Sequence, residues 1–236
     1  MSAPTGGGAL AGDGALAASV AGNLARLRAR IASAGDPAAV RIVAVTKTFP
    51  LAAVFAARAA GLADIGENYA NELVDKAAAA GAAGASELRW HFLGELQRNK
   101  LARLAPLVAC YQGLDRLEEG EGLARRRPGA RVLVEVDVAG TPGRGGVAPR
   151  EVTPLVGALV RLELDVAGLM TVAPPDPVAA RRAFSLVAAL RAELGLAEAS
   201  MGMSDDLELA VEAGSTMVRV GSALFGPRAG QGPVPQ

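Results

Sequence analysis

The sequence predicts an α/β protein that folds as a single (β/α)8 TIM barrel with an extra N-terminal helix. Three observations lead to this fold class. Short apolar runs alternate with helical patterns, and such alternation implies a parallel sheet. Eight of these units follow one another in 236 residues, a length that suits one closed barrel. An open, doubly wound sheet is the alternative, but no Gly-x-Gly-x-x-Gly fingerprint follows the first strand.

The N-terminal half contains the extra helix and four strand–helix units. Apolar residues recur at helical spacing over 13–33, which predicts a long amphipathic helix. The apolar run 42–46 is the first predicted strand, and Pro50 opens the helix 51–60 after it. The remaining strands of this half are predicted at 62–65, 88–93 and 108–111. Their helices start near 70, near 97 and at 116, and the last two end near Pro106 and at Arg127.

The C-terminal half supplies four more units. Its strands are predicted at 131–138, 164–170, 199–203 and 217–220. Its helices are predicted at 149–162, 177–194, 205–213 and 222–225. In terms of domains, we expect a disordered Gly/Ala-rich segment at 1–12, the barrel at 13–228 and a loose tail at 229–236.

Composition narrows the class of protein. The 24 basic and 24 acidic residues cancel, so no global charge favours nucleic acid or an anionic membrane as a partner. No apolar run reaches the roughly 18 residues that a membrane span needs. The N-terminus lacks the basic region of a signal peptide. A single cysteine, Cys110, excludes an intrachain disulfide and suits a reducing compartment, so we expect a cytoplasmic protein.

Lys47 is the first candidate functional residue, because it stands where the strand 42–46 ends. Functional groups of a (β/α)8 barrel collect at the C-terminal ends of its strands. Lysine is seldom fully buried without a partner, so Lys47 either emerges into solvent or serves as an amine nucleophile. An amine at this place can form a Schiff base with a carbonyl compound.

A phosphate site is predicted on the opposite side of the barrel. The loops after the seventh and eighth strands of such barrels often hold a phosphate. Here these loops carry Ser204 and the small pair Gly221-Ser222. Ordinary N-capping by the two serines is the alternative. Arg219 precedes Gly221 by two residues, and this spacing gives both the same parity, so Arg219 either enters the barrel mouth or faces a helix.

These motifs resemble the pyridoxal phosphate (PLP) homeostasis protein family, which is alanine racemase N-terminal-like and of fold-type III. The resemblance covers about 42–228. It is carried by several stretches: Val45-Thr46-Lys47-Thr48, Ile65-Gly66-Glu67-Asn68-Tyr69, Trp90-His91-Phe92-Leu93-Gly94, Gly168-Leu169-Met170, Ser200-Met201-Gly202-Met203-Ser204-Asp205-Asp206-Leu207 and Val218-Arg219-Val220-Gly221-Ser222.

The resemblance implies pyridoxal 5'-phosphate as the cofactor, held as a Schiff base on Lys47. It implies phosphate contacts from Ser204, Gly221 and Ser222, and it places Arg219 at the pyridine nitrogen. We count Asn68 and Met170, which lie in matching motifs, among the cofactor-binding residues. Arg144 stands where the family usually has a lysine and is a doubtful counterpart.

Three functions stay open. The first is a non-catalytic carrier and buffer that passes the cofactor to apoenzymes. The second is a weak amino-acid racemase, and the third is an aldolase-like enzyme that uses Lys47 on a sugar phosphate. A permanently protonated arginine cannot protonate the ring nitrogen, which limits carbanion chemistry. Racemases of this fold use a tyrosine from a second domain, and none is expected here, so the carrier is favoured.

The remaining polar residues are expected to have structural roles. His91, the only histidine, is expected to be a structural residue satisfied by hydrogen bonds, with an acid–base role as the alternative. No His, Cys and Asp cluster has metal-ligand spacing. We expect a monomer.

Overall fold

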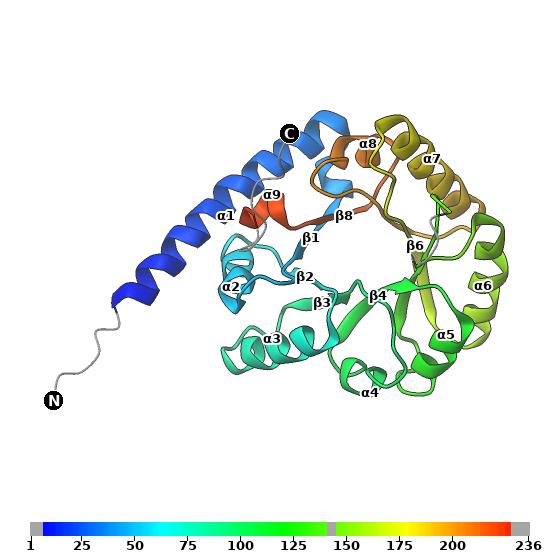
Figure 1. Ribbon diagram of the computed structural model, residues 1–236, viewed down its shortest axis with the longest axis horizontal. Coiled ribbons are helices and arrows are strands. Elements are labelled where there is room, and N and C mark those ends of the chain that lie inside the picture. The colour runs from blue at the N-terminus through cyan, green and yellow to red at the C-terminus, as the bar shows by residue number, and fades with distance from the viewer. Residues whose placement is uncertain (1–6, 141–144, 228–236) are drawn as a thin grey trace.

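The strands close into a complete barrel. The computed structural model describes residues 7–140 and 145–227 of the chain. Eight parallel strands pair in sequence order, and β1 pairs with β8, where Ile42 lies opposite Val218. The strands are β1 (Arg41–Val45), β2 (Asp64–Glu67), β3 (Arg89–Phe92), β4 (Val108–Leu114), β5 (Arg131–Glu135), β6 (Asp165–Met170), β7 (Glu198–Ser200) and β8 (Met217–Val220). The predicted TIM barrel is confirmed (Figure 1).

Helices form the outer layer of the barrel (Figure 1). They are α1 (Gly7–Ala34), α2 (Leu51–Ala59), α3 (Ala70–Ala82), α4 (Leu101–Leu104), α5 (Leu117–Ala124), α6 (Pro149–Arg161), α7 (Pro177–Glu193), α8 (Leu207–Glu212) and α9 (Ser222–Phe225). A short 3-10 helix, Pro37–Ala39, joins α1 to β1. None of the helices in the described part of the chain combines the length and the apolarity needed to cross a membrane.

Some strand boundaries differ from those predicted. Strand β2 is shifted two residues toward the C-terminus, and it buries Glu67 completely. A charged residue is not expected in a buried strand, so Glu67 is not included in the predicted strand. Lys76, which lies outside the strand, pairs with it. Strand β7 ends at Ser200 instead of residue 203, because Gly202 has a φ of +90° and turns the chain. A Cβ at Gly202 would lie 2.5 Å from the Cβ of Ala210, so no other residue fits this turn.

Helix α1 begins earlier than predicted. It starts at Gly7, so residues 7–12 are helical where the sequence predicted disorder. The disorder predicted for 1–6 and the tail predicted at 229–236 lie outside the described residues.

The long N-terminal helix completes the outer layer. Helix α9 is a single turn and covers little of the barrel beside β8. Helix α1 packs against α2, α8 and α9 there (Figure 1). It buries a stripe of four apolar side chains at helical spacing: Val20, Leu24, Leu27 and Ile31. The side-chain amide of Asn23 also donates to the carbonyl of Leu224, at 2.8 Å.

A truncation in this stripe tests whether α1 is part of the core. Leu27→Ala leaves a cavity under a side chain that is 2% exposed, so we expect a loss of about 2–5 kcal/mol in the free energy of unfolding. Chemical denaturation measures this loss. Arg28→Ala, one residue further on an exposed face, is the control and should change stability by less than about 0.5 kcal/mol. Equal effects of the two substitutions would contradict the packing of α1.

Candidate functional site

A cavity of about 450 Å³ opens at the C-terminal ends of the strands. All seven residues predicted to bind the cofactor line this cavity: Lys47, Asn68, Met170, Ser204, Arg219, Gly221 and Ser222. Val45, Leu93, Glu135, Val172, Met203 and Asp205 complete the lining. The structure therefore brings together residues that are up to 175 positions apart, from Lys47 to Ser222. This is the rim at which barrel enzymes and binding proteins place their sites.

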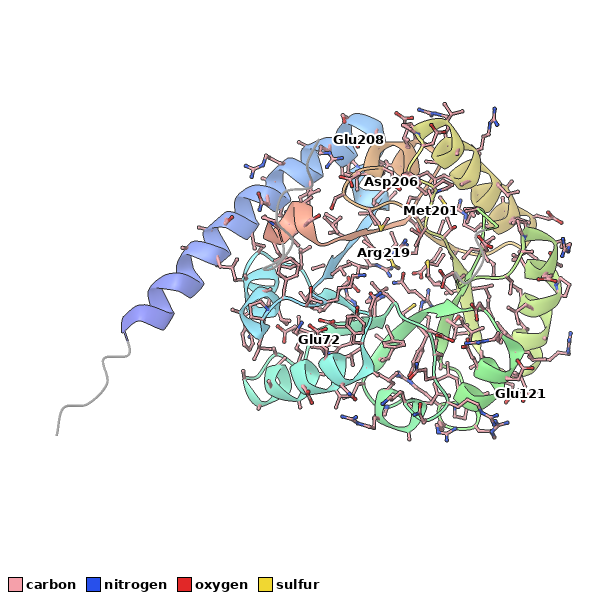
Figure 2. The ribbon with its side chains drawn as sticks, in the orientation of Figure 1. Glu72, Glu121, Met201, Asp206, Glu208 and Arg219 are labelled. Carbon is pink, nitrogen blue, oxygen red and sulfur yellow. The ribbon has the colours of Figure 1, made fainter. Side chains whose placement is uncertain are left out.

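Arg219 projects into the barrel and not toward a helix. Figure 2 shows it inside the ring of strands, and its side chain is 6% exposed. Its Nη1 donates to the carbonyl and the hydroxyl of Ser200, at 2.7 and 2.8 Å, and its Nη2 donates to the carbonyl of Thr171, at 2.8 Å. Burial lowers the pKa of Arg219 to about 10, and the charges of Glu135 and Asp206 oppose this shift. The guanidinium stays protonated at neutral pH.

The serines of the last two loops line the same cavity. Because β8 pairs with β1, they lie on the side next to Lys47 and not on the opposite side of the barrel as predicted. The hydroxyls of Ser204 and Ser222 are 3.3 Å apart, and the Ser204 hydroxyl also accepts from the backbone N–H of Ala223, at 3.3 Å. The first N–H groups of a helix have no partner within the helix. Two hydroxyls and the start of α9 therefore form a cluster of donors suited to an anion.

Helix α1 holds this loop in place from outside. The guanidinium of Arg30 donates to both carboxylate oxygens of Glu208, at 2.5 and 2.7 Å. The same side chain donates to the carbonyl of Ser204, at 3.0 Å. A bidentate contact of this kind fixes the geometry of the groups it joins. The extra N-terminal helix thus supports the serine loop as well as the core.

A buried ion network holds the segment that carries Lys47. The amine of Lys76 on α3 donates to Glu67, to Glu72 and to the carbonyl of Thr46, at 2.7, 2.7 and 2.6 Å. The hydroxyl of Thr46 donates to Glu67 at 2.6 Å. Burial raises the pKa of the Glu67 carboxyl, and the hydrogen bonds from Lys76 and Thr46 offset part of the shift. Lys47, half-buried at the rim, follows directly on Thr46.

The residue after Lys47 has an unusual backbone conformation. Thr48 has a φ of +64°, which is unfavourable for a β-branched side chain. Its N–H donates to Glu72 at 2.7 Å, so the network described above also holds this turn. Backbone strain of this kind persists only where the surroundings enforce it, and it is frequent at functional sites. No local pattern predicts this network, because Glu67 lies beyond the predicted strand 62–65 and its partners Glu72 and Lys76 lie on the following helix.

The remaining candidates lie elsewhere. His91 is 2% exposed inside the barrel, and both ring nitrogens are hydrogen-bonded, which confirms the structural interpretation. Tyr111 is fully buried on β4, where burial raises its pKa to about 12, and Tyr69 is exposed. Neither tyrosine lines the cavity. Arg144 lies outside the described residues. Within the described part, no group of three or more His, Cys, Asp or Glu side chains is arranged to hold a metal ion.

The sequence is similar to proteins of one known family. The family model for the alanine racemase N-terminal domain matches residues 17–229. The pyridoxal phosphate homeostasis protein of Pseudomonas aeruginosa is 41% identical over 225 residues, covering 89% of this chain and 96% of that protein. The protein of the same name from Escherichia coli K12 is 34% identical over 226 residues, covering 89% and 97%.

Solved structures show the same barrel. PipY of Synechococcus elongatus, solved without PLP, superposes with a TM-score of 0.79 at 32% identity and covers 88% of this chain and 100% of that one. The alanine racemase of E. faecalis shares the fold with a TM-score of 0.68 at 17% identity, covering 89% of this chain and 58% of that one. The chain is thus a barrel of the alanine racemase N-terminal domain class. It belongs to the family of pyridoxal phosphate homeostasis proteins.

Removing Lys76 tests the network behind Lys47. Lys76→Met leaves the buried Glu67 carboxylate without its cation, so we expect a loss of about 3–5 kcal/mol in the free energy of unfolding at neutral pH. The pKa of Glu67 is already raised in the folded state, and the substitution raises it further. A group with a raised folded pKa destabilises the fold as pH rises, so the loss should be smaller near pH 5 than at pH 7.

Chemical denaturation at the two pH values measures this difference. Lys100→Met, the same change at a lysine outside this network, is the control. Glu67→Gln added to Lys76→Met should recover part of the stability, because it removes the unpaired charge. A pH-independent loss in the single variant would show that Glu67 does not carry the effect.

Proposed function

We propose that this chain binds pyridoxal 5'-phosphate in the cavity and acts in PLP homeostasis, as a carrier that holds the cofactor and releases it to apoenzymes. The observation that carries the proposal is the convergence of Lys47, Arg219 and the Ser204–Ser222 pair on one cavity of about 450 Å³. Membership of the family and the solved PLP-bound form of PipY, at 32% identity, support it.

The residues present fit the groups of this cofactor. The amine of Lys47 lines the cavity and suits the aldehyde, with which a lysine forms a reversible Schiff base. The hydroxyls of Ser204 and Ser222, with the N–H groups at the start of α9, suit the phosphate. Arg219 presents a cation toward the same cavity, where it suits the ring nitrogen. Asn68 and Met170 line the same cavity.

Two features favour holding the cofactor over catalysis. PLP supplies an electron sink for carbanions when its ring nitrogen is protonated. Arg219 donates hydrogen bonds, but its guanidinium keeps its protons at neutral pH. It therefore cannot protonate the ring nitrogen. Racemisation also needs a base on each face of the substrate, and neither described tyrosine lines the cavity. A monomer is part of the proposal, because the large exposed apolar side chains are dispersed over several elements.

The lysine assignment has a direct test. The sequence contains three lysines, and only Lys47 lines the cavity. Added PLP should give the wild-type protein the visible absorption band of a protein-bound Schiff base. Borohydride reduction followed by peptide mass spectrometry should place the label on Lys47. Lys47→Ala should lose the band, whereas Lys100→Ala should keep it. Absence of the band in the wild-type protein would refute the cofactor proposal.

The carrier and racemase functions are separated by turnover. The carrier should exchange the α-proton of amino acids in deuterated water far more slowly than the about 1–1000 per second of ordinary enzymes. Proton NMR of alanine incubated with the PLP-loaded protein measures this rate. An authentic alanine racemase is the positive control. Exchange at enzyme rates would replace the carrier function with catalysis.

A further inference from the structure

A chain of buried hydrogen bonds crosses the interior of the barrel from Arg219. Its Nη1 donates to the hydroxyl of Ser200 on β7, at 2.8 Å. That hydroxyl donates to Oε1 of Gln112 on β4, at 2.6 Å. Nε2 of Gln112 lies 2.8 Å from Nδ1 of His91 on β3, and Nε2 of His91 lies 2.8 Å from Asp64 on β2. All five side chains are at most 6% exposed.

The two ends of the chain fix its direction. A guanidinium only donates, so Ser200 accepts from Arg219 and turns its own proton toward Gln112. Gln112 therefore presents its oxygen to Ser200 and its NH2 group to His91, whose Nδ1 accepts. The second amide proton of Gln112 faces the sulfur of Met217, at 3.1 Å.

An ionised carboxylate terminates the chain. Burial disfavours the charged form of Asp64, but hydrogen bonds from His91 and Arg89 outweigh it and hold the pKa of Asp64 well below its usual range. An ionised carboxylate only accepts, so Nε2 of His91 carries the proton. Every hydrogen bond then points the same way, from the cation at the cavity to the anion on β2.

Such a chain is unusual in the middle of a barrel. Barrel interiors are filled mainly by branched apolar side chains in layers, and here one route through them is polar. Buried polar groups cost free energy unless all are satisfied, and a satisfied network specifies one arrangement. Ser200 and Gln112 do not line the cavity, so they reach it only through Arg219.

We propose that Ser200, Gln112 and His91 are positioning residues that hold the guanidinium of Arg219 in one orientation toward the cofactor ring. This inference rests on the proposed function, because that function places the ring against Arg219. The three residues do not touch the cofactor. They set where Arg219 directs its remaining donors, and a change at one link alters the cation that the ring nitrogen meets.

Nitrogen NMR of the only histidine tests the chain in the wild-type protein. The signals of His91 are unique, since the sequence has one histidine. We expect the proton on Nε2, and we expect added PLP to shift the Nδ1 signal. A proton on Nδ1, or PLP binding without any change at His91, would overturn the inference.

Substitutions test whether the chain acts on binding. Ser200→Ala should weaken PLP binding about tenfold, the size of one hydrogen bond to a charged group, and should shift the visible band. Gln112→Leu leaves every direct contact of Arg219 intact and should still shift the band, because it acts through Ser200. Ser200→Thr keeps the hydroxyl and should restore the wild-type affinity.

Ser215→Ala is the matched control. Ser215 is also a buried serine beside β7 and β8, but its hydroxyl bonds only to the carbonyls of Ala199, Met201 and Met217. It should lose stability without a change in PLP affinity. If Ser200→Ala and Ser215→Ala bind PLP equally, the positioning role is wrong while the carrier function stands. If the wild-type protein binds no PLP, the proposed function itself is wrong.

Discussion

The buried charge of Arg219 is the constraint on which the site depends. A guanidinium that is 6% exposed must satisfy its donors from within the protein. The carbonyls of Thr171 and Ser200 do so at the ends of β6 and β7, and the Ser200 hydroxyl adds a third acceptor. The adjacent strands β6, β7 and β8 therefore all contribute to holding one cation. The cavity above these strands is therefore lined at this point by the Arg219 cation in a fixed position.

A second buried cation organises the adjacent wall, because β1 pairs with β8. Lys76 ties β1, β2 and α3 together through Thr46, Glu67 and Glu72. It holds the strained turn beside Lys47, just as Ser200 holds Arg219. Each wall thus has one amine or guanidinium that meets the cavity and a polar network behind it. The separation between Lys47 and Arg219 is set by the pairing of β1 with β8 in the closed sheet.

The sequence predicted the fold and the cavity-lining residues better than their supports. Strand ends carry the signal for Lys47, Ser204 and Gly221, because a parallel barrel brings all its C-terminal strand ends to one rim. The supports depend on pairs remote in sequence. Ser200 and Gln112 are 88 residues apart, and no local pattern reports their contact. Gln112 also lies beyond the predicted strand 108–111, because β4 extends to Leu114.

The networks of Arg219 and Lys76 are compatible with a protein that holds and releases a cofactor. A carrier needs a rigid receptor for the ring and phosphate, together with an amine whose bond to the cofactor is reversible. We propose Arg219 and the Ser204–Ser222 pair as this receptor, and Arg30 of helix α1 contacts the serine loop from outside. Lys47, the amine that we propose to bind the cofactor reversibly, is half-buried at the rim. Arg219 is 6% exposed whereas Lys47 is half-buried, so the amine at the rim is more accessible from solvent than the guanidinium.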